Sequence, residues 1–210
     1  MSLALLAAII SVISLDTTIA FQVLISSPIF ACPLLGWLMG DLQTGFELGV
    51  LFQLIWLGRI PAGATSVPEG NLATMWATAL VILLKELNFP HTTLTMVVLL
   101  AIGFSYLGAK VTIAYRKMNG YFLDWSLKQL EQMKRPHLGL VELTSILFYL
   151  VIIFMVTWIT LYAALQLLYQ VVPAIGATFE TKLVVIRPVL FGIGLATVMP
   201  MLWSAFKERK

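Results

Sequence analysis

Long apolar stretches with few charges recur along this chain, and they constrain its fold more than any other feature. Residues 139–169 contain one charged side chain, that of Glu142, and residues 72–87, 93–115 and 184–206 contain at most two each. About 20 apolar residues in a helix cross the ~30 Å hydrocarbon core of a bilayer. Of the 210 residues, 60% are hydrophobic and 11% are charged, whereas about 25% are charged in a soluble domain. The sequence therefore predicts an all-α, polytopic membrane protein with about five to seven transmembrane segments.

The charge balance and the reactive residues exclude several classes of function. The net charge of +3 could suggest nucleic-acid binding. In a predicted membrane protein, however, we expect the excess of basic residues to mark the cytoplasmic side of the membrane. The lone Cys32 cannot form an internal disulfide, and His91 and His137 are too far apart in sequence to suggest a metal site. Neither a nucleophile elbow nor a phosphate-binding loop occurs in the sequence. We therefore expect no metal, no cofactor and no catalytic site in this chain.

Polar breaks divide the first part of the chain. No basic residue precedes the apolar start, so we expect residues 3–25 to contain a retained first helix, interrupted at Asp16, and not a cleaved signal. A polar, glycine-bearing turn interrupts residues 29–57. The halves on either side of it, 29–39 and 46–57, are each too short to cross a bilayer. This pattern predicts a re-entrant or broken helix pair, which is tolerated at membrane depth where protein or a cavity shields the backbone.

Residues 116–137 differ from the rest of the chain. They carry five basic and two acidic side chains, and aromatic and leucine side chains recur there at near-helical spacing. This composition predicts a basic, amphipathic helix lying at the membrane surface. Two predicted spans separate it from the basic tail at 207–210, so both basic segments can be cytoplasmic. The side on which the N-terminus lies stays open, and we expect residues 1–210 to form a single integral membrane domain.

A few polar side chains fall in or beside the predicted membrane segments, where a charge costs about 2.5–3.5 kcal/mol at a helix centre. Polar residues persist there when they face a cavity or a partner. Among them, Glu47 and Arg59 can form a structural ion pair. The remaining candidates, which we expect to bind a substrate, are Gln53, Glu69, Asn71, Asp16 and Asp41.

These candidates also have purely structural interpretations. Asp16 and Asp41 can cap helix breaks. Gln53 can join two helices, and Gly49, one turn before it, would let another backbone approach the Gln53 amide. The sequence alone leaves these alternatives open. Glycines at a spacing typical of close helix packing are Gly36, Gly40, Gly45 and Gly49.

The region that holds these residues resembles a known family. The runs LGWLMGDLQTG at 35–45 and GVLFQLIWLGRIPAGA at 49–64, followed by Pro68-Glu69, are similar to the membrane subunit IIC of the mannose–fructose–sorbose group of the bacterial phosphotransferase system. The resemblance covers about residues 14–80. In that family an acid usually occupies the position of Gln53, and an aspartate follows the proline where this chain has Glu69.

The resemblance implies a sugar-translocating subunit of the bacterial inner membrane that moves a hexose-like sugar while partners phosphorylate it. It implies a IID-like membrane partner, soluble IIA and IIB phosphoryl carriers and an oligomer embedded in membrane lipid, with no catalytic site on the IIC chain itself. A second interpretation is a non-transporting docking or regulatory subunit of an incomplete phosphotransferase system, which would recruit soluble partners through residues 116–137. A third is a carrier driven by an ion gradient without phosphoryl transfer.

Overall fold

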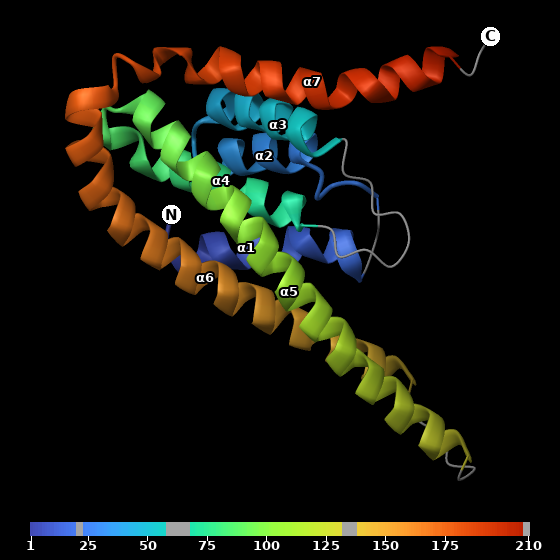
Figure 1. Cartoon of the computed structure of the whole chain (residues 1–210). Coiled ribbons are helices and arrows are strands. Elements are labelled where there is room, and N and C mark those ends of the chain that lie inside the picture. The colour runs from blue at the N-terminus through green and yellow to red at the C-terminus, as the bar shows by residue number, and fades with distance from the viewer. Residues whose placement is uncertain (20–22, 58–67, 132–137, 208–210) are drawn as a thin grey trace.

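The computed structural model describes residues 1–19, 23–57, 68–131 and 138–207, and the regular secondary structure of these ranges is helical (Figure 1). The predicted all-α fold is confirmed. Three of the described helices are long and apolar enough to cross a membrane, within Pro90–Gln129, Gly139–Phe179 and Leu183–Pro200, whereas α1, α2 and α3 are apolar but shorter. In chain order the elements are α1 (Leu3–Thr18), α2 (Pro28–Leu38), α3 (Leu42–Leu57), α4 (Gly70–Leu83), η1 (Leu84–Leu87), α5 (Pro90–Glu131), α6 (Leu138–Phe179), η2 (Leu183–Val185) and α7 (Ile186–Lys207).

Helix α4 lies at the centre of the fold. Residues 72–80 are all buried, as expected of a helix whose side chains are apolar or small on every face. The hydroxyls of Thr74 and Thr78 donate to carbonyl oxygens one turn earlier, at 2.7 and 2.9 Å, so these polar groups are satisfied without water. Helix α4 contacts α1, α2, α3, α5 and α6. The other helices are therefore assembled around it.

The predicted broken pair at 29–57 is confirmed as helices α2 and α3. Helix α2 ends at Leu38, and Gly40 follows with a φ of +81°, a left-handed conformation that glycine adopts readily. The Asp41 N–H then donates to the Gly36 carbonyl at 2.7 Å, which satisfies an orphan carbonyl of the helix end. The chain reverses in this turn, and α3 begins at Leu42.

Glycines bring the two helices of the pair into backbone contact. A Cβ added at Gly45 would lie 2.5 Å from the carbonyl oxygen of Cys32, and one added at Gly36 would lie 2.8 Å from the Gly45 Cα. A Cβ at Gly49 would lie 2.7 Å from the Pro28 carbonyl oxygen. Close packing is confirmed for these three glycines. Gly40 has no atom within 4 Å of an added Cβ and serves the turn instead.

Helices α5 and α6 have 42 residues each, and the end of α5 and the start of α6 extend together beyond the other helices (Figure 1). The expectation of a separate surface helix at 116–137 is wrong, because α5 continues unbroken to Glu131; residues 132–137 lie outside the described residues. No proline interrupts α5 after its first residue, and side chains tie its second half to α6. The Tyr115 hydroxyl lies 2.6 Å from the Ser145 hydroxyl, which donates to Asn119 Oδ1 at 2.7 Å. The cytoplasmic location of this segment stays a prediction.

The start of α5 is capped from a distant part of the chain. The N–H groups of His91 and Thr92 donate to the two carboxylate oxygens of Glu180, each at 2.9 Å. Glu180 lies in the turn after α6, which extends to Phe179. Burial alone would raise the pKa of Glu180, but the hydrogen bonds from His91 and Thr92 outweigh it and hold the pKa below its ordinary value.

Helix α7 packs mainly along α3 (Figure 1). The Thr197 hydroxyl donates to the Leu54 carbonyl at 2.9 Å. A Cβ added at Gly194 would lie only 2.7 Å from the Leu54 Cβ, so α7 approaches α3 through a glycine. On the other side of α4, α1 packs beside α6, where the Tyr149 hydroxyl donates to the Ser14 carbonyl at 3.2 Å.

Candidate functional site

Asp16 closes the turn that follows α1. The helix ends at Thr18, earlier than the apolar stretch 3–25 suggests, and the Asp16 side chain lies in its last turn with 7% of the residue exposed. One carboxylate oxygen accepts the N–H of Val23 at 2.7 Å, and the other accepts the N–H of Ser26 at 2.9 Å. Buried backbone N–H groups need such partners. The geometry shows a structural role for Asp16, which holds the turn after α1; it caps no helix start, because Val23 and Ser26 lie between α1 and α2.

Asn71 reaches the same turn from the start of α4. Its side-chain N–H₂ donates to the Ser26 hydroxyl oxygen at 3.3 Å, and the Ser26 side chain also interacts with the carboxylate of Asp16. The end of α1, the segment before α2 and the first turn of α4 therefore meet at Ser26.

Gln53 reaches the N-terminus of α2 from α3. Its side-chain oxygen Oε1 accepts the Ile29 N–H at 3.3 Å, one of the helix N–H groups that have no partner within α2. Gly49, one turn earlier, faces the carbonyl of Pro28 without a side chain between them. The predicted approach of a second backbone to the Gln53 amide is confirmed.

Glu69 lies against α5. Its N–H donates to the Ser105 carbonyl at 2.9 Å, and its Cβ would be 2.9 Å from a Cβ added at Gly108. Its carboxyl group interacts with the Thr112 side chain and with the positive charge of Arg116. These α5 positions recur every three or four residues, so Glu69 follows one face of that helix.

Trp56, near the end of α3, covers the first turn of α4. A Cβ added at Gly70 would lie 2.7 Å from the Trp56 indole ring, so the absence of a side chain there lets the ring pack directly on the α4 backbone. An aromatic wall beside a few polar groups is a common composition of small-molecule sites. Residues 58–67, which include Arg59, lie outside the described residues.

Asp41 is not part of this cluster, because it lies at the other end of α3. It caps that helix, accepting the Thr44 N–H at 3.2 Å and the Thr44 hydroxyl at 2.8 Å. It also forms an ion pair with Lys85 at 2.8 Å. The geometry thus shows the capping interpretation of Asp41, and four of the five predicted residues, Gln53, Glu69, Asn71 and Asp16, lie around the start of α2 and α4.

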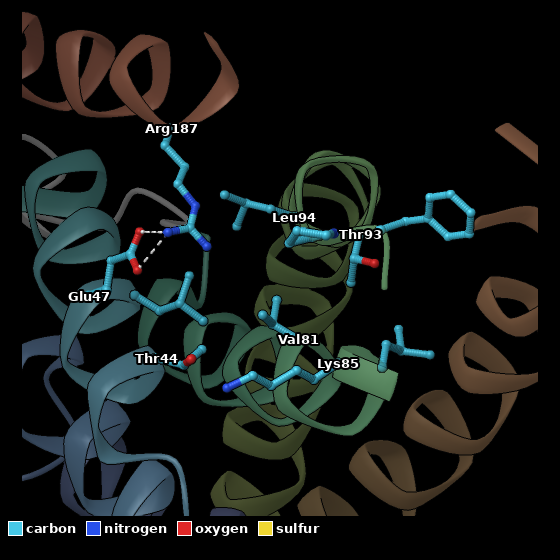
Figure 2. A pocket seen from close by; sticks show the side chains of 11 residues that line it. Thr44, Glu47, Val81, Lys85, Thr93, Leu94 and Arg187 are labelled. Carbon is cyan, nitrogen blue, oxygen red and sulfur yellow. Dashed lines mark hydrogen bonds and ion pairs between the residues drawn. The ribbon is translucent and has the colours of Figure 1, made fainter. Parts of the chain in front are cut away.

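A small pocket with both polar and apolar side chains in its lining lies between α3, α4, η1, α5 and α7 (Figure 2). Its volume is about 70 Å³, well below the ~300–1,000 Å³ of ligand pockets. Glu47 forms an ion pair with Arg187 of α7 at 2.9 Å, whereas Arg59, the partner that the sequence suggests as possible, lies outside the described residues. Glu47 and Arg187 are 140 residues apart in sequence. Residue spacing within one helix therefore cannot predict this ion pair.

Comparison with known proteins identifies the family of this arrangement. The family described as the sorbose-specific IIC component of the phosphotransferase system matches residues 1–206. The chain belongs to this family. IIC components of this kind are membrane proteins of the bacterial inner membrane, which agrees with the three long apolar helices.

Curated IIC relatives match part of the chain. The sorbose-specific EIIC component of Klebsiella pneumoniae is 27% identical over 119 residues, which is 57% of this chain and 42% of the relative. The mannose-specific EIIC component of Escherichia coli K12 is 33% identical over 95 residues, 45% of this chain and 34% of the relative. The matched stretches thus span less than half the length of these two relatives.

A solved structure shows the same fold. The cryo-EM structure of the mannose transporter ManYZ in complex with microcin E492 contains a chain that matches with a TM-score of 0.58 at 24% identity. The match covers 95% of this chain and 77% of that chain.

Two contacts of the candidate site are not predicted by the sequence. Ser26 joins Asp16 to Asn71, and Arg116 faces Glu69 from the middle of α5. Ser26 stands beside Ser27 just before Pro28, with no signal that separates it from an ordinary helix-start residue. In the sequence, Arg116 is one of the basic residues of the segment 116–137. The charge pattern of that segment does not indicate a contact between Arg116 and Glu69.

Proposed function

We propose that this chain is the sugar-translocating IIC subunit of a phosphoenolpyruvate-dependent phosphotransferase system and moves a hexose-like sugar across the membrane. The observation that carries the proposal is that, in a chain of the IIC family, Gln53 contacts the start of α2 while Asn71 and Glu69 lie at the start of α4, where Asn71 contacts Ser26 just before α2. Asp16 holds the turn between them.

The chemistry of this group suits a sugar. A hexose presents several hydroxyls, each of which donates and accepts, so it needs convergent side chains of both kinds. Amides and a carboxylate supply them, and the Trp56 ring supplies an apolar surface. In this proposal Gln53, Asn71 and Glu69 contact the sugar and Asp16 fixes the backbone that positions them.

Partners follow from the family and are part of the same proposal. The solved ManYZ complex contains two kinds of transporter subunit by its name, and we propose a IID-like membrane partner for this chain. Soluble IIA and IIB proteins would carry the phosphoryl group, as membership of the IIC family suggests. An oligomer of such pairs is the expected assembly.

Uptake of labelled sugars by cells that express this chain with its partner subunits tests the proposal. Mannose, fructose and sorbose form the first panel, and Gln53→Leu and Glu69→Ala are the variants. Each variant removes hydrogen bonds to the substrate, and uptake should fall at least about tenfold. Gln43→Leu, on the exposed start of the same helix, and Asp124→Ala, on the exposed part of α5, are matched controls that should keep wild-type uptake.

Protein amount in the membrane and elution from a size-exclusion column separate lost binding from lost folding. Full uptake by both site variants would rule out the assigned residues. Wild-type chain that binds a IIB-like protein, while neither binding nor transporting any sugar, would favour the docking or regulatory alternative.

A further inference from the structure

The orientation of the Gln53 side chain is dictated by its partner. Ile29 offers an N–H, which is a donor, so the group that meets it at 3.3 Å must be the amide oxygen of Gln53. Rotating the amide would place two donors face to face and leave the Ile29 N–H unpaired at the helix start. The side-chain oxygen of Gln53 therefore faces the N-terminus of α2 and accepts its hydrogen bond there.

The amide nitrogen of Gln53 is left for another partner. Gln53 is half-buried, and no hydrogen bond to this nitrogen occurs within residues 1–19, 23–57, 68–131 and 138–207. An amide nitrogen carries two N–H groups and accepts nothing. On the α3 side of the site, Gln53 thus presents a pure donor.

The α4 side of the site has the opposite character. The Ser26 hydroxyl interacts with the Asp16 carboxylate, which only accepts, so its oxygen receives the Asn71 N–H₂. This leaves the Asn71 side-chain oxygen as an acceptor, whereas the Glu69 carboxyl group interacts with Thr112 and Arg116 of α5. Ser26 and Ile29 are three residues apart, so the Gln53 donor and the Asn71 acceptor flank one short segment of chain.

We propose that Gln53 is a specificity-determining residue, whose donor selects sugars that present an acceptor to α3 and rejects those that present a protonated amino group there. The substrate class is a neutral hexose or a derivative whose group at that position is a carbonyl or ether oxygen. This inference rests on the proposed sugar site. A glutamate at position 53 would keep one oxygen on the Ile29 N–H and turn the other, an acceptor, toward the substrate.

Substituted sugars measure this polarity directly. Purified full-length chain in lipid nanodiscs is titrated with the best-bound hexose and with its fluoro-deoxy and amino-deoxy derivatives at C2, C3, C4 and C6. Fluorine can only accept, and an ammonium group can only donate. At one ring position, the wild type should tolerate fluorine within about threefold and lose at least about tenfold in affinity for the ammonium derivative.

Gln53→Glu should reverse the order at that same ring position, so that the ammonium derivative binds better than the fluoro derivative. Gln43→Glu adds an equal charge on an exposed part of α3 and should keep the wild-type order. Because each result is a ratio within one protein, a general loss of affinity cancels.

The outcomes separate the two levels of the proposal. If no sugar binds to wild-type chain that elutes as a folded species, the sugar site and this inference both fail. If sugars bind but no ring position combines tolerance of fluorine with rejection of ammonium, the sugar site stands and the role of Gln53 is refuted. If Gln53→Glu binds the fluoro and ammonium derivatives in the same order of affinity as the wild type, the role of Gln53 is refuted as well. If that variant does not fold, the titrations of the wild-type chain with the substituted sugars decide whether Gln53 has this role.

Discussion

At the scale of single residues, the carboxylate of Glu180 connects the turn after α6 to the start of α5. Its oxygens receive two N–H groups at the start of α5, and these hydrogen bonds lower its pKa. A group whose pKa is lower in the folded state stabilises that state above its unfolded pKa, and the contribution disappears as the pH falls through the folded value. We expect Glu180→Gln to reduce the stability by about 1 kcal/mol at pH 7, the usual cost of a lost helix cap.

The pH dependence of thermal unfolding in detergent checks this expectation. The difference between wild type and Glu180→Gln should shrink as the pH is lowered from about 5 to 3, because the wild-type carboxylate then becomes protonated. Asp124→Asn, on an exposed part of α5, removes a carboxylate without removing a cap and should match wild type throughout. A difference for Glu180→Gln that stays constant with pH would contradict the assignment.

At the scale of elements, the contact between α2 and α3 depends on glycines. A Cβ at Gly45 would lie 2.5 Å from the Cys32 carbonyl oxygen, so Gly45→Ala should push the helices apart at a cost of about 1–3 kcal/mol. Cys32 is fully buried in this contact, so its rate of reaction with a maleimide should increase in the variant. Gly120→Ala in α5, where an added Cβ meets nothing within 4 Å, should instead stabilise by up to about 1 kcal/mol.

Helix propensity alone would assign both alanine substitutions the same sign. If Gly45→Ala proves as stable as Gly120→Ala and Cys32 stays protected in both, the packing of α2 on α3 differs from the arrangement described above.

At the scale of the whole molecule, the position of α7 on α3 can be tested by cross-linking. A Cβ added at Gly194 would lie 2.7 Å from the Leu54 Cβ, and disulfides need about 3.5–4.5 Å between Cβ atoms. In a Cys32→Ala background, Leu54→Cys combined with Gly194→Cys should form a disulfide after a small outward shift of α7. Mass spectrometry of the digested, unreduced protein detects the linked peptides.

Gly192 provides the matched control, because a Cβ added there meets nothing within 4 Å although it lies on the same helix. Leu54→Cys with Gly192→Cys should therefore remain unlinked under the same oxidation. Equal cross-linking of the two pairs, or of neither, would show that α7 does not hold this position on α3.

The amino-acid sequence by itself determined the class of the protein, the broken pair and much of the candidate site. Hydropathy identifies membrane helices because the length of an apolar helix must match the thickness of the bilayer. The polar, glycine-bearing turn before α3 indicates a helix break from its residue types alone. The sequence also indicated Gln53, Glu69 and Asn71, since polar groups beside apolar segments need a reason to be there. These three residues were identifiable because they lie within or beside the stretch at 14–80 that resembles the IIC family.

Only the tertiary structure decided which of these residues meet. Asp41 precedes α3 and Gln53 lies near the other end of that helix; the first pairs with Lys85 and the second reaches α2. The partners of Glu47 and of the α5 N-terminus, Arg187 and Glu180, are far away in sequence, and the continuation of α5 past residue 116 depends on side chains of α6. Local spacing specifies which face of a helix a residue occupies, but which groups lie opposite that face is set by how the helices pack around α4.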